Sequence, residues 1–122
     1  MPDRLVGLRV VADPAAIDGA RFGGDQVMVL RFAPDDAFAP GADTVEVDDP
    51  DAIVELETGF VGIWCDLEDV ARRIEWSIPP ERPGFAQGAI AGVPARLVLP
   101  GGERVLVVCA AAYADELTGR LG

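Results

Sequence analysis

The side chains with the most chemistry to offer are seven carboxylates crowded into residues 43–57. Carboxylate oxygens suit Ca²⁺ or Mg²⁺, and paired carboxylates can act as general acid and base. The segment lacks the alternating acids, central Gly and final Glu of an EF-hand loop, and nothing in it forces two acids into apolar surroundings. We therefore interpret it as an acidic surface, either solvated or docking an Arg-rich partner, with a carboxylate-only divalent metal site as an alternative. Its members are Asp43, Glu46, Asp48, Asp49, Asp51, Glu55 and Glu57.

The net charge of −11 is concentrated around this cluster. Residues 1–31 hold four Arg and four Asp, and residues 72–122 hold six Arg and five acids, whereas residues 32–71 hold twelve acids and no base. This segregation predicts one acidic face between two neutral ends. The scattered Arg residues form no basic surface for phosphates or anionic lipids, so we expect neither nucleic acid nor membrane as a partner.

Missing residue types exclude most enzyme classes. The chain has no His, Lys or Asn and a single Ser, Ser77. Without His, the common zinc sites and the Ser-His-Asp and Cys-His catalytic arrangements cannot be built. Without Lys there is neither a Schiff base nor a P-loop. We predict no catalytic, cofactor-binding or metal-ligating residue, no cofactor, and no catalytic activity of the chain's own.

The two cysteines each end an apolar run. Cys65 and Cys109 are interpreted as buried free thiols that act as small hydrophobes. The alternative places Cys109 at the start of the last helix, where the helix dipole would lower its pKa. Trp64 and Trp76 flank the first predicted helix and are interpreted as core or interface anchors.

Length and composition indicate one globular domain over residues 1–122. The chain has a mass of 12.8 kDa, half of its residues are apolar and its mean hydropathy is +0.25, so it can form a real core. No apolar run approaches the roughly 20 residues that span a bilayer. The start of the chain lacks the layout of a signal peptide. We expect a cytoplasmic protein.

The N-terminal half is expected to be rich in strands. Apolar runs predict strands over residues 5–11 and 26–32, the second buried on both faces, with a loop or short helical turn between them. Residues 33–36 and 40–41 predict turns. Alternation predicts a half-exposed strand over 44–47, and 53–56 and 60–64 are strand-like with an interruption at Thr58 and Gly59.

The C-terminal half carries the two predicted helices and a hairpin. Asp66 as N-cap and an apolar stripe on Leu67, Val70, Ala71 and Ile74 predict a helix that ends near Glu75. Residues 85–90 are expected to be extended. Residues 94–99 and 104–109, joined by Pro100–Gly102, predict a hairpin, and a last helix is expected from about residue 111 to 121.

The order of these elements predicts an α+β fold. From residue 53 onward the sequence gives strand, helix, strand, strand, helix, which is most of a split β-α-β unit of the ferredoxin-like type. We expect an antiparallel sheet with both helices on one face. The N-terminal strands within residues 5–32 would complete the core formed by residues 53–121.

Three segments resemble those of one known family. Residues 30–36 (LRFAPDD) are similar to a strand that ends in a Leu-Arg-Leu-Gly-Pro-Asp-Glu type turn, and residues 85–95 (FAQGAIAGVPA) to a glycine-rich turn entering a hairpin strand. Residues 105–121 are similar to a closing strand and helix. In this order they resemble the gamma subunit of heterotetrameric sarcosine oxidase, a family itself similar to the folate-binding domain of glycine cleavage T-proteins.

The resemblance implies a non-catalytic accessory or assembly subunit. In that enzyme the flavins, nicotinamide cofactor and folate belong to the larger subunits, and the gamma subunit packs against them. The expected partners are larger subunits of a flavin-dependent amine oxidase, or a second copy of the chain. The alternative is a stand-alone binder of a folate-like aromatic acid, whose carboxylates would meet Arg residues such as Arg31, Arg96 or Arg104.

Overall fold

The computed structural model describes residues 2–121 and divides the chain into two compact units. Residues 5–58 form the first, called here the N-terminal unit. Residues 59–121, together with residues 2–4, form the second, called the C-terminal unit. The long strand β6 (Ile53–Asp66) and the strand β1 (Asp3–Val11) contribute residues to both.

The N-terminal unit is built from short antiparallel strands. After β1 come the one-turn helix α1 (Pro14–Asp18), β2 (Arg21–Gly24), β3 (Leu30–Ala33), β4 (Asp36–Pro40) and β5 (Ala42–Glu46). Strands β3, β4, β1 and β6 are neighbours in that order, while β2 pairs with β5 in a separate two-stranded sheet. Its core includes Val10, Ala12, Ile17 and Ala37, against which Val45 and Val47 pack.

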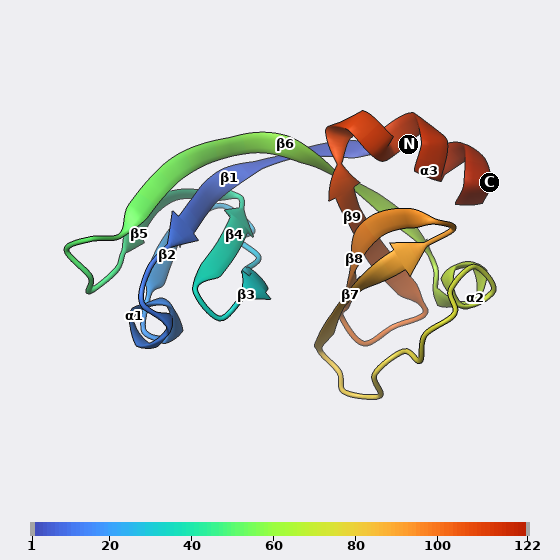
Figure 1. The fold of residues 1–122 in the computed structure, drawn as a ribbon, viewed down its shortest axis with the longest axis horizontal. Helices are drawn as coiled ribbons and strands as arrows, with labels where there is room; N and C mark the ends of the chain where they lie inside the picture. The colour runs from blue at the N-terminus through green and yellow to red at the C-terminus, as the bar shows by residue number, and fades with distance from the viewer. Residues whose placement is uncertain (1, 122) are drawn as a thin grey trace. The chain divides into compact units, whose positions relative to one another are not determined.

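The C-terminal unit contains a three-stranded meander, with a further strand paired to its last strand, and short helices (Figure 1). The second half of β6 leads through α2 (Leu67–Ala71) and a proline-rich segment to β7 (Gly84–Ile90), β8 (Val93–Leu99) and β9 (Arg104–Ala110). A 3₁₀ turn (Ala111–Tyr113) and α3 (Ala114–Leu121) close the chain. The strand order is β6-β9-β8-β7, and the core is aliphatic, with Leu97, Val107 and Leu117 fully buried.

The expected ferredoxin-like α+β fold is wrong, because the protein is mostly β. The strands form a seven-stranded sheet in the order β3-β4-β1-β6-β9-β8-β7. The pairs β3–β4, β4–β1, β6–β9, β9–β8 and β8–β7 are antiparallel. The helix predicted to end near Glu75 ends at Ala71 after five residues, too short to cover a sheet. The apolar stripe persists beyond it, since Ile74 and Trp76 still pack on the core from irregular chain. The spacing of the apolar residues therefore indicated which side chains are buried, but it did not predict where the helix ends.

Two strand boundaries also differ from expectation. The strand predicted over 26–32 begins only at Leu30, because Gln26 has a φ of 51°, which breaks the extended backbone. Residues 53–64 contain no interruption at Gly59, since β6 runs unbroken for 14 residues. The strand over 5–11, the turn after Ala33 and the hairpin of β8 and β9 are confirmed.

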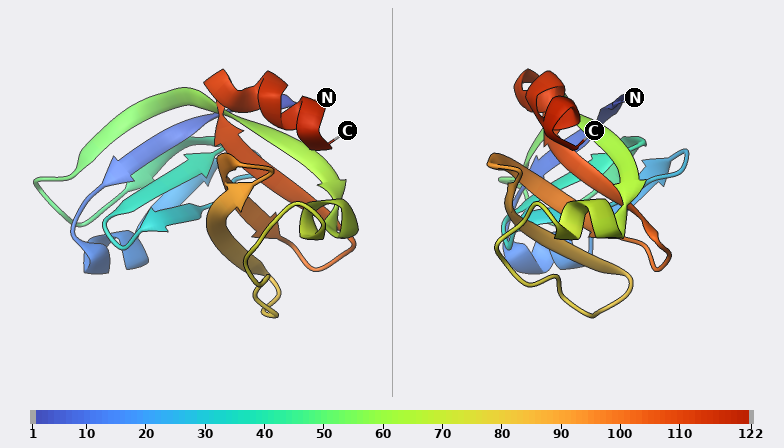
Figure 2. Two further views of the ribbon diagram at one scale, coloured as in Figure 1. Left: turned by 45° about the vertical axis from the view of Figure 1, so that its right-hand side comes forward. Right: turned by 90° about the vertical axis from the view of Figure 1, so that its right-hand side faces the viewer.

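The tightest hairpin joins β7 to β8. Ile90 pairs with Val93, which leaves only Ala91 and Gly92 in the loop, with φ angles of 51° and 80°. Two consecutive left-handed residues are the signature of a type I′ turn, whose twist matches that of the strands it joins. The three strands β7, β8 and β9 lie side by side in both further views (Figure 2).

Among residues 2–121, no helix is long and apolar enough to cross a membrane.

Candidate functional site

The acidic cluster maps onto β5, the loop after it and the first half of β6, all within the N-terminal unit. Five of its seven members are exposed, while Asp49 and Glu57 are half-buried. The members do not converge on one point: residues 2–121 contain no group of three or more Asp, Glu, Cys or His side chains placed to hold a metal ion. The cluster is a surface spread along two strands and a loop.

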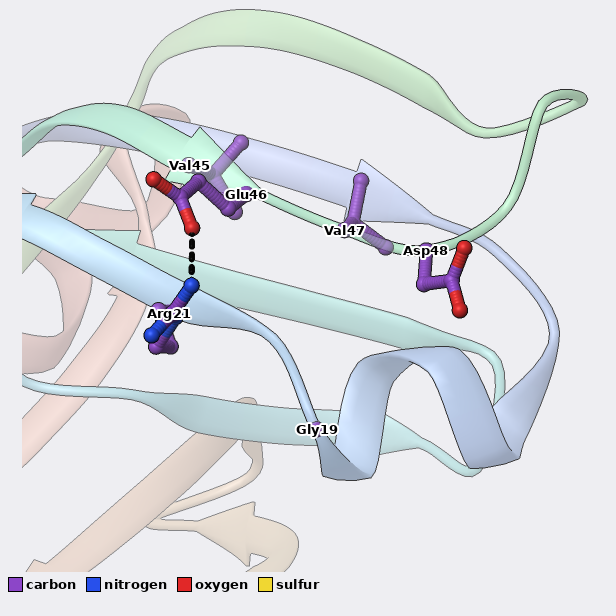
Figure 3. A pocket seen from close by; sticks show the side chains of 6 residues that line it. All are labelled: Gly19, Arg21, Val45, Glu46, Val47 and Asp48. Atoms are coloured by element: carbon purple, nitrogen blue, oxygen red, sulfur yellow. Dashed lines mark hydrogen bonds and ion pairs between the residues drawn. The ribbon is translucent and has the colours of Figure 1, made fainter.

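Glu46 forms an ion pair with an Arg on the neighbouring strand. Its carboxylate accepts a hydrogen bond from Arg21 at 2.5 Å, which joins the paired strands β5 and β2 across their exposed face. Figure 3 shows this ion pair beside Val45 and Val47, whose side chains lie on the opposite side of the strand. The same residues, with Gly19 and Asp48, line an open hollow of about 450 Å³. Because both side chains of the pair are mostly exposed, it contributes little to stability.

Asp49 anchors the loop between β5 and β6. Its two carboxylate oxygens accept hydrogen bonds from the backbone N–H of Asp13, at 2.8 Å, and of Asp51, at 2.9 Å. The first bond ties the loop to the start of α1, and the second closes a turn. These two N–H donors, that of Asp13 first, hold the pKa of Asp49 below its usual value of 3.8.

Replacement of Asp49 by alanine is expected to lower the melting temperature in a pH-dependent way. A carboxyl whose pKa is depressed by folding stabilises the protein above its unfolded pKa, and that stability is lost as pH falls through the folded pKa. The difference between wild type and Asp49→Ala should be constant above about pH 5 and shrink progressively below pH 3.8. Thermal unfolding followed by circular dichroism, from about pH 7 to about pH 2.5, checks this because the range lies on both sides of the usual Asp value of 3.8. Asp48→Ala is the control. A difference unchanged at low pH would refute the assigned role.

Glu57 belongs to a charged group that the sequence did not reveal. Arg9 on β1 makes a two-bond contact with Asp36 on β4, at 2.6 and 2.7 Å, and a third bond to Glu57 at 3.0 Å. The guanidinium also lies 4.9 Å from the ring centre of Phe32. These side chains are only about a quarter exposed (28%, 22% and 24% for Arg9, Asp36 and Glu57). The hydrogen bond to Asp36 is the main reason that the pKa of Arg9 is raised.

No spacing rule connects these residues, because they are 27 and 48 positions apart. Asp36 was expected to be a turn former after Pro34; it instead begins β4 and faces the Arg9 side chain. The turn itself is formed by Pro34 and Asp35. One Arg thus fixes the neighbouring strands β4, β1 and β6 of the N-terminal unit to each other.

The start of β6 is unusually apolar for an exposed strand. Ile53, Val54 and Leu56 are 55%, 43% and 69% exposed, and Glu55 between them is exposed as well. Successive residues of a strand point to opposite faces, so both faces of this segment are open. Val6 on the neighbouring strand β1 is also 46% exposed. Exposed apolar patches of this kind mark interaction sites.

The cysteines show no sign of activation. Cys109 lies inside β9, fully buried, and not at the start of a helix, so the alternative of a dipole-activated thiol is wrong. Burial raises the pKa of the Cys109 thiol. Burial is also the largest influence on Cys65, whose pKa is raised although Arg104 opposes the shift. Both thiols are free, as expected, but only Cys109 is buried, whereas Cys65 is half-buried.

The three arginines proposed to bind a carboxylate ligand are each engaged. Arg31 donates to the carbonyls of Pro14 and Pro34 and to Asp18 in the N-terminal unit. In the C-terminal unit, Arg104 pairs with Asp66 at 3.6 Å, and Arg96 donates to Gln87 and lies over the ring of Phe60. Binding of a folate-like acid stays a prediction that no contact here favours.

The comparison that bears on function is with a solved structure. No family model matches the chain, and no curated protein matches it. The fold is that of a sarcosine oxidase chain. It superposes with a TM-score of 0.68 on a chain of heterotetrameric sarcosine oxidase from Corynebacterium sp. U-96, solved in complex with pyrrole 2-carboxylate. The match covers 98% of this chain and 79% of that one at 11% sequence identity.

At that identity the likeness establishes the fold alone. The matched chain is itself a component of a heterotetrameric assembly. Coverage of about four-fifths of the matched chain means that the two are of similar size.

Proposed function

We propose that the chain is a non-catalytic accessory or assembly subunit, similar to the gamma subunit of heterotetrameric sarcosine oxidase, which packs against larger subunits of a flavin-dependent amine oxidase. The superposition over 98% of the chain carries this proposal. The matched chain is only modestly longer than this one, which suits a small subunit and not a flavin-binding one.

The chemistry of the described residues supports the same proposal. Burial raises the pKa of both thiols, and Arg31 and Arg82 donate to the Asp18 carboxylate and the Pro79 carbonyl, respectively. The hollow beside the Arg21–Glu46 pair is wide and polar, unlike the enclosed apolar pockets that hold cofactors. By contrast, the open apolar start of β6 is the kind of surface that a subunit buries on assembly.

Purification of the tagged chain from its native host tests the proposal. We expect larger chains with a flavin absorption spectrum to be recovered in a fixed ratio to the tagged chain through several chromatographic steps. A control tag without the chain should recover none. Recovery of the chain by itself, under conditions that keep oxidase complexes intact, would overturn the proposal.

A further inference from the structure

The first four residues of β6 form a strand segment with an open edge. In the sheet, β6 lies between β1 and β9. The pairing with β9 begins only at Phe60, opposite Ala110, and continues to Asp66. Within residues 2–121, no strand is therefore assigned to the edge of Ile53–Leu56 that faces away from β1. Figure 1 shows this part of β6 running beside β1.

Such edges are normally protected. Natural proteins place Lys, Pro or a bulge on an exposed edge strand because its free N–H and C=O groups would otherwise pair with another chain. This segment has no Lys or Pro: Ile53 and Val54 have high β propensity, and Ile53, Val54 and Leu56 are 43–69% exposed. Its one charged residue is Glu55, so the edge is suited to accept an added strand of opposite charge.

Charge identifies the kind of strand that fits. Glu55 lies within the segment and Asp51 just before it, and no Arg or Lys occurs between Arg31 and Arg72. A second copy of the chain would bring seven carboxylates of residues 43–57 against the same seven, which electrostatics opposes. An extended segment with alternating apolar and basic side chains would satisfy both the apolar area and the negative potential.

We infer that Ile53–Leu56 is the docking edge for a strand of a protein partner in which apolar residues alternate with Arg or Lys. This inference rests on the proposed function, since the partner would be a larger subunit of the assembly. Backbone hydrogen bonds to the edge give affinity in such complexes, and the alternating side chains give specificity.

Peptide binding to the full chain tests the edge directly. The probe is a fluorescent peptide of about eight residues that alternates valine with arginine, a common strand length. It should bind and slow hydrogen exchange of the amides of residues 53–56 by about tenfold or more, because strand addition protects them. A valine–glutamate peptide and a valine–arginine peptide N-methylated at alternate amides should each bind at least about tenfold more weakly. Unchanged exchange at 53–56, or equal binding of either comparison peptide, overturns the inference.

A pair of matched variants separates the edge from general surface charge. Leu56→Lys should weaken binding of the valine–arginine peptide about tenfold. The substitution removes the most exposed apolar side chain of the segment and adds a positive charge, which repels the arginines of the peptide. Val29→Lys makes a similar change at a residue that is 52% exposed and lies outside any strand, and should alter binding by less than about twofold. Equal losses in the two variants, or none in Leu56→Lys, contradict the inference. Protection of residues 53–56 that grows with the concentration of the chain alone would assign the edge to a second copy and also overturn it.

Purification from the host keeps the two proposals distinguishable. If wild type and Leu56→Lys recover equal amounts of the same flavin-containing partner, the docking edge is wrong and the accessory function stands. If the peptide results hold but wild type recovers no partner, the accessory function fails and the strand-binding edge stands by itself.

Discussion

Replacement of Phe38 by alanine should destabilise the N-terminal unit more than any other single truncation considered. Phe38 is fully buried on β4, and its ring centre lies 6.0 Å from that of Phe32. Loss of a buried phenyl group costs about 3–5 kcal/mol, since the cavity adds to the lost transfer energy. A whole domain is stable by only about 5–15 kcal/mol. Much of the protein should therefore unfold at lower temperature or urea concentration.

Urea unfolding followed by fluorescence and circular dichroism measures this effect. Val29→Ala serves as the control, because its side chain is half exposed and its removal should change the free energy of unfolding by less than about 0.5 kcal/mol. A loss below about 1 kcal/mol in Phe38→Ala would mean that the core of this unit is not packed around the β4 phenyl ring.

Replacement of Arg9 by methionine is expected to cost about 2 kcal/mol. The side chain makes three charge-assisted hydrogen bonds, and its loss removes the guanidinium that binds both Asp36 and Glu57. The cost stays below that of a fully buried pair because the carboxylates remain 22% and 24% exposed and can still be hydrated. The free energy of unfolding in urea measures it.

Arg21→Met provides the comparison for Arg9. Arg21 also pairs with one Glu, but its side chain is 81% exposed, so its loss should cost less than about 0.5 kcal/mol. In the double variant Arg9→Met, Glu57→Gln, part of the lost stability should return, because one of the two facing charges is gone. If both Arg variants lose the same free energy of unfolding, the contact of Arg9 with two neighbouring strands stabilises the protein no more than an exposed ion pair does.

The sequence predicted the elements whose signals are local. The hairpin of β8 and β9 follows from two apolar runs around Pro100–Gly102, and the turn after Ala33 from its Pro and Asp residues. The helix after Asp66 failed because Ile74 and Trp76 are apolar for the sake of the core and not of a helix. With that helix reduced to five residues, the ferredoxin-like arrangement lost its main support.

The geometry of the acidic surface was predicted only in outline. Charge counting located the acidic stretch, but it could not show that Asp49 caps a turn or that Glu57 is bound by Arg9, since both depend on contacts between distant strands. The apolar residues between the acids were interpreted as an ordinary strand. Their exposure follows from where β9 stops pairing, at Phe60, and no local pattern encodes that position.

Native mass spectrometry of the tagged chain purified from its own host tests the central claim most directly. We expect the chain, of 12.8 kDa plus the mass of its tag, in a fixed ratio with larger, flavin-containing chains, and we expect dissociation in the gas phase to release it intact from them. Detection of only the mass of the tagged chain, or of multiples of that mass, would contradict its being an accessory subunit.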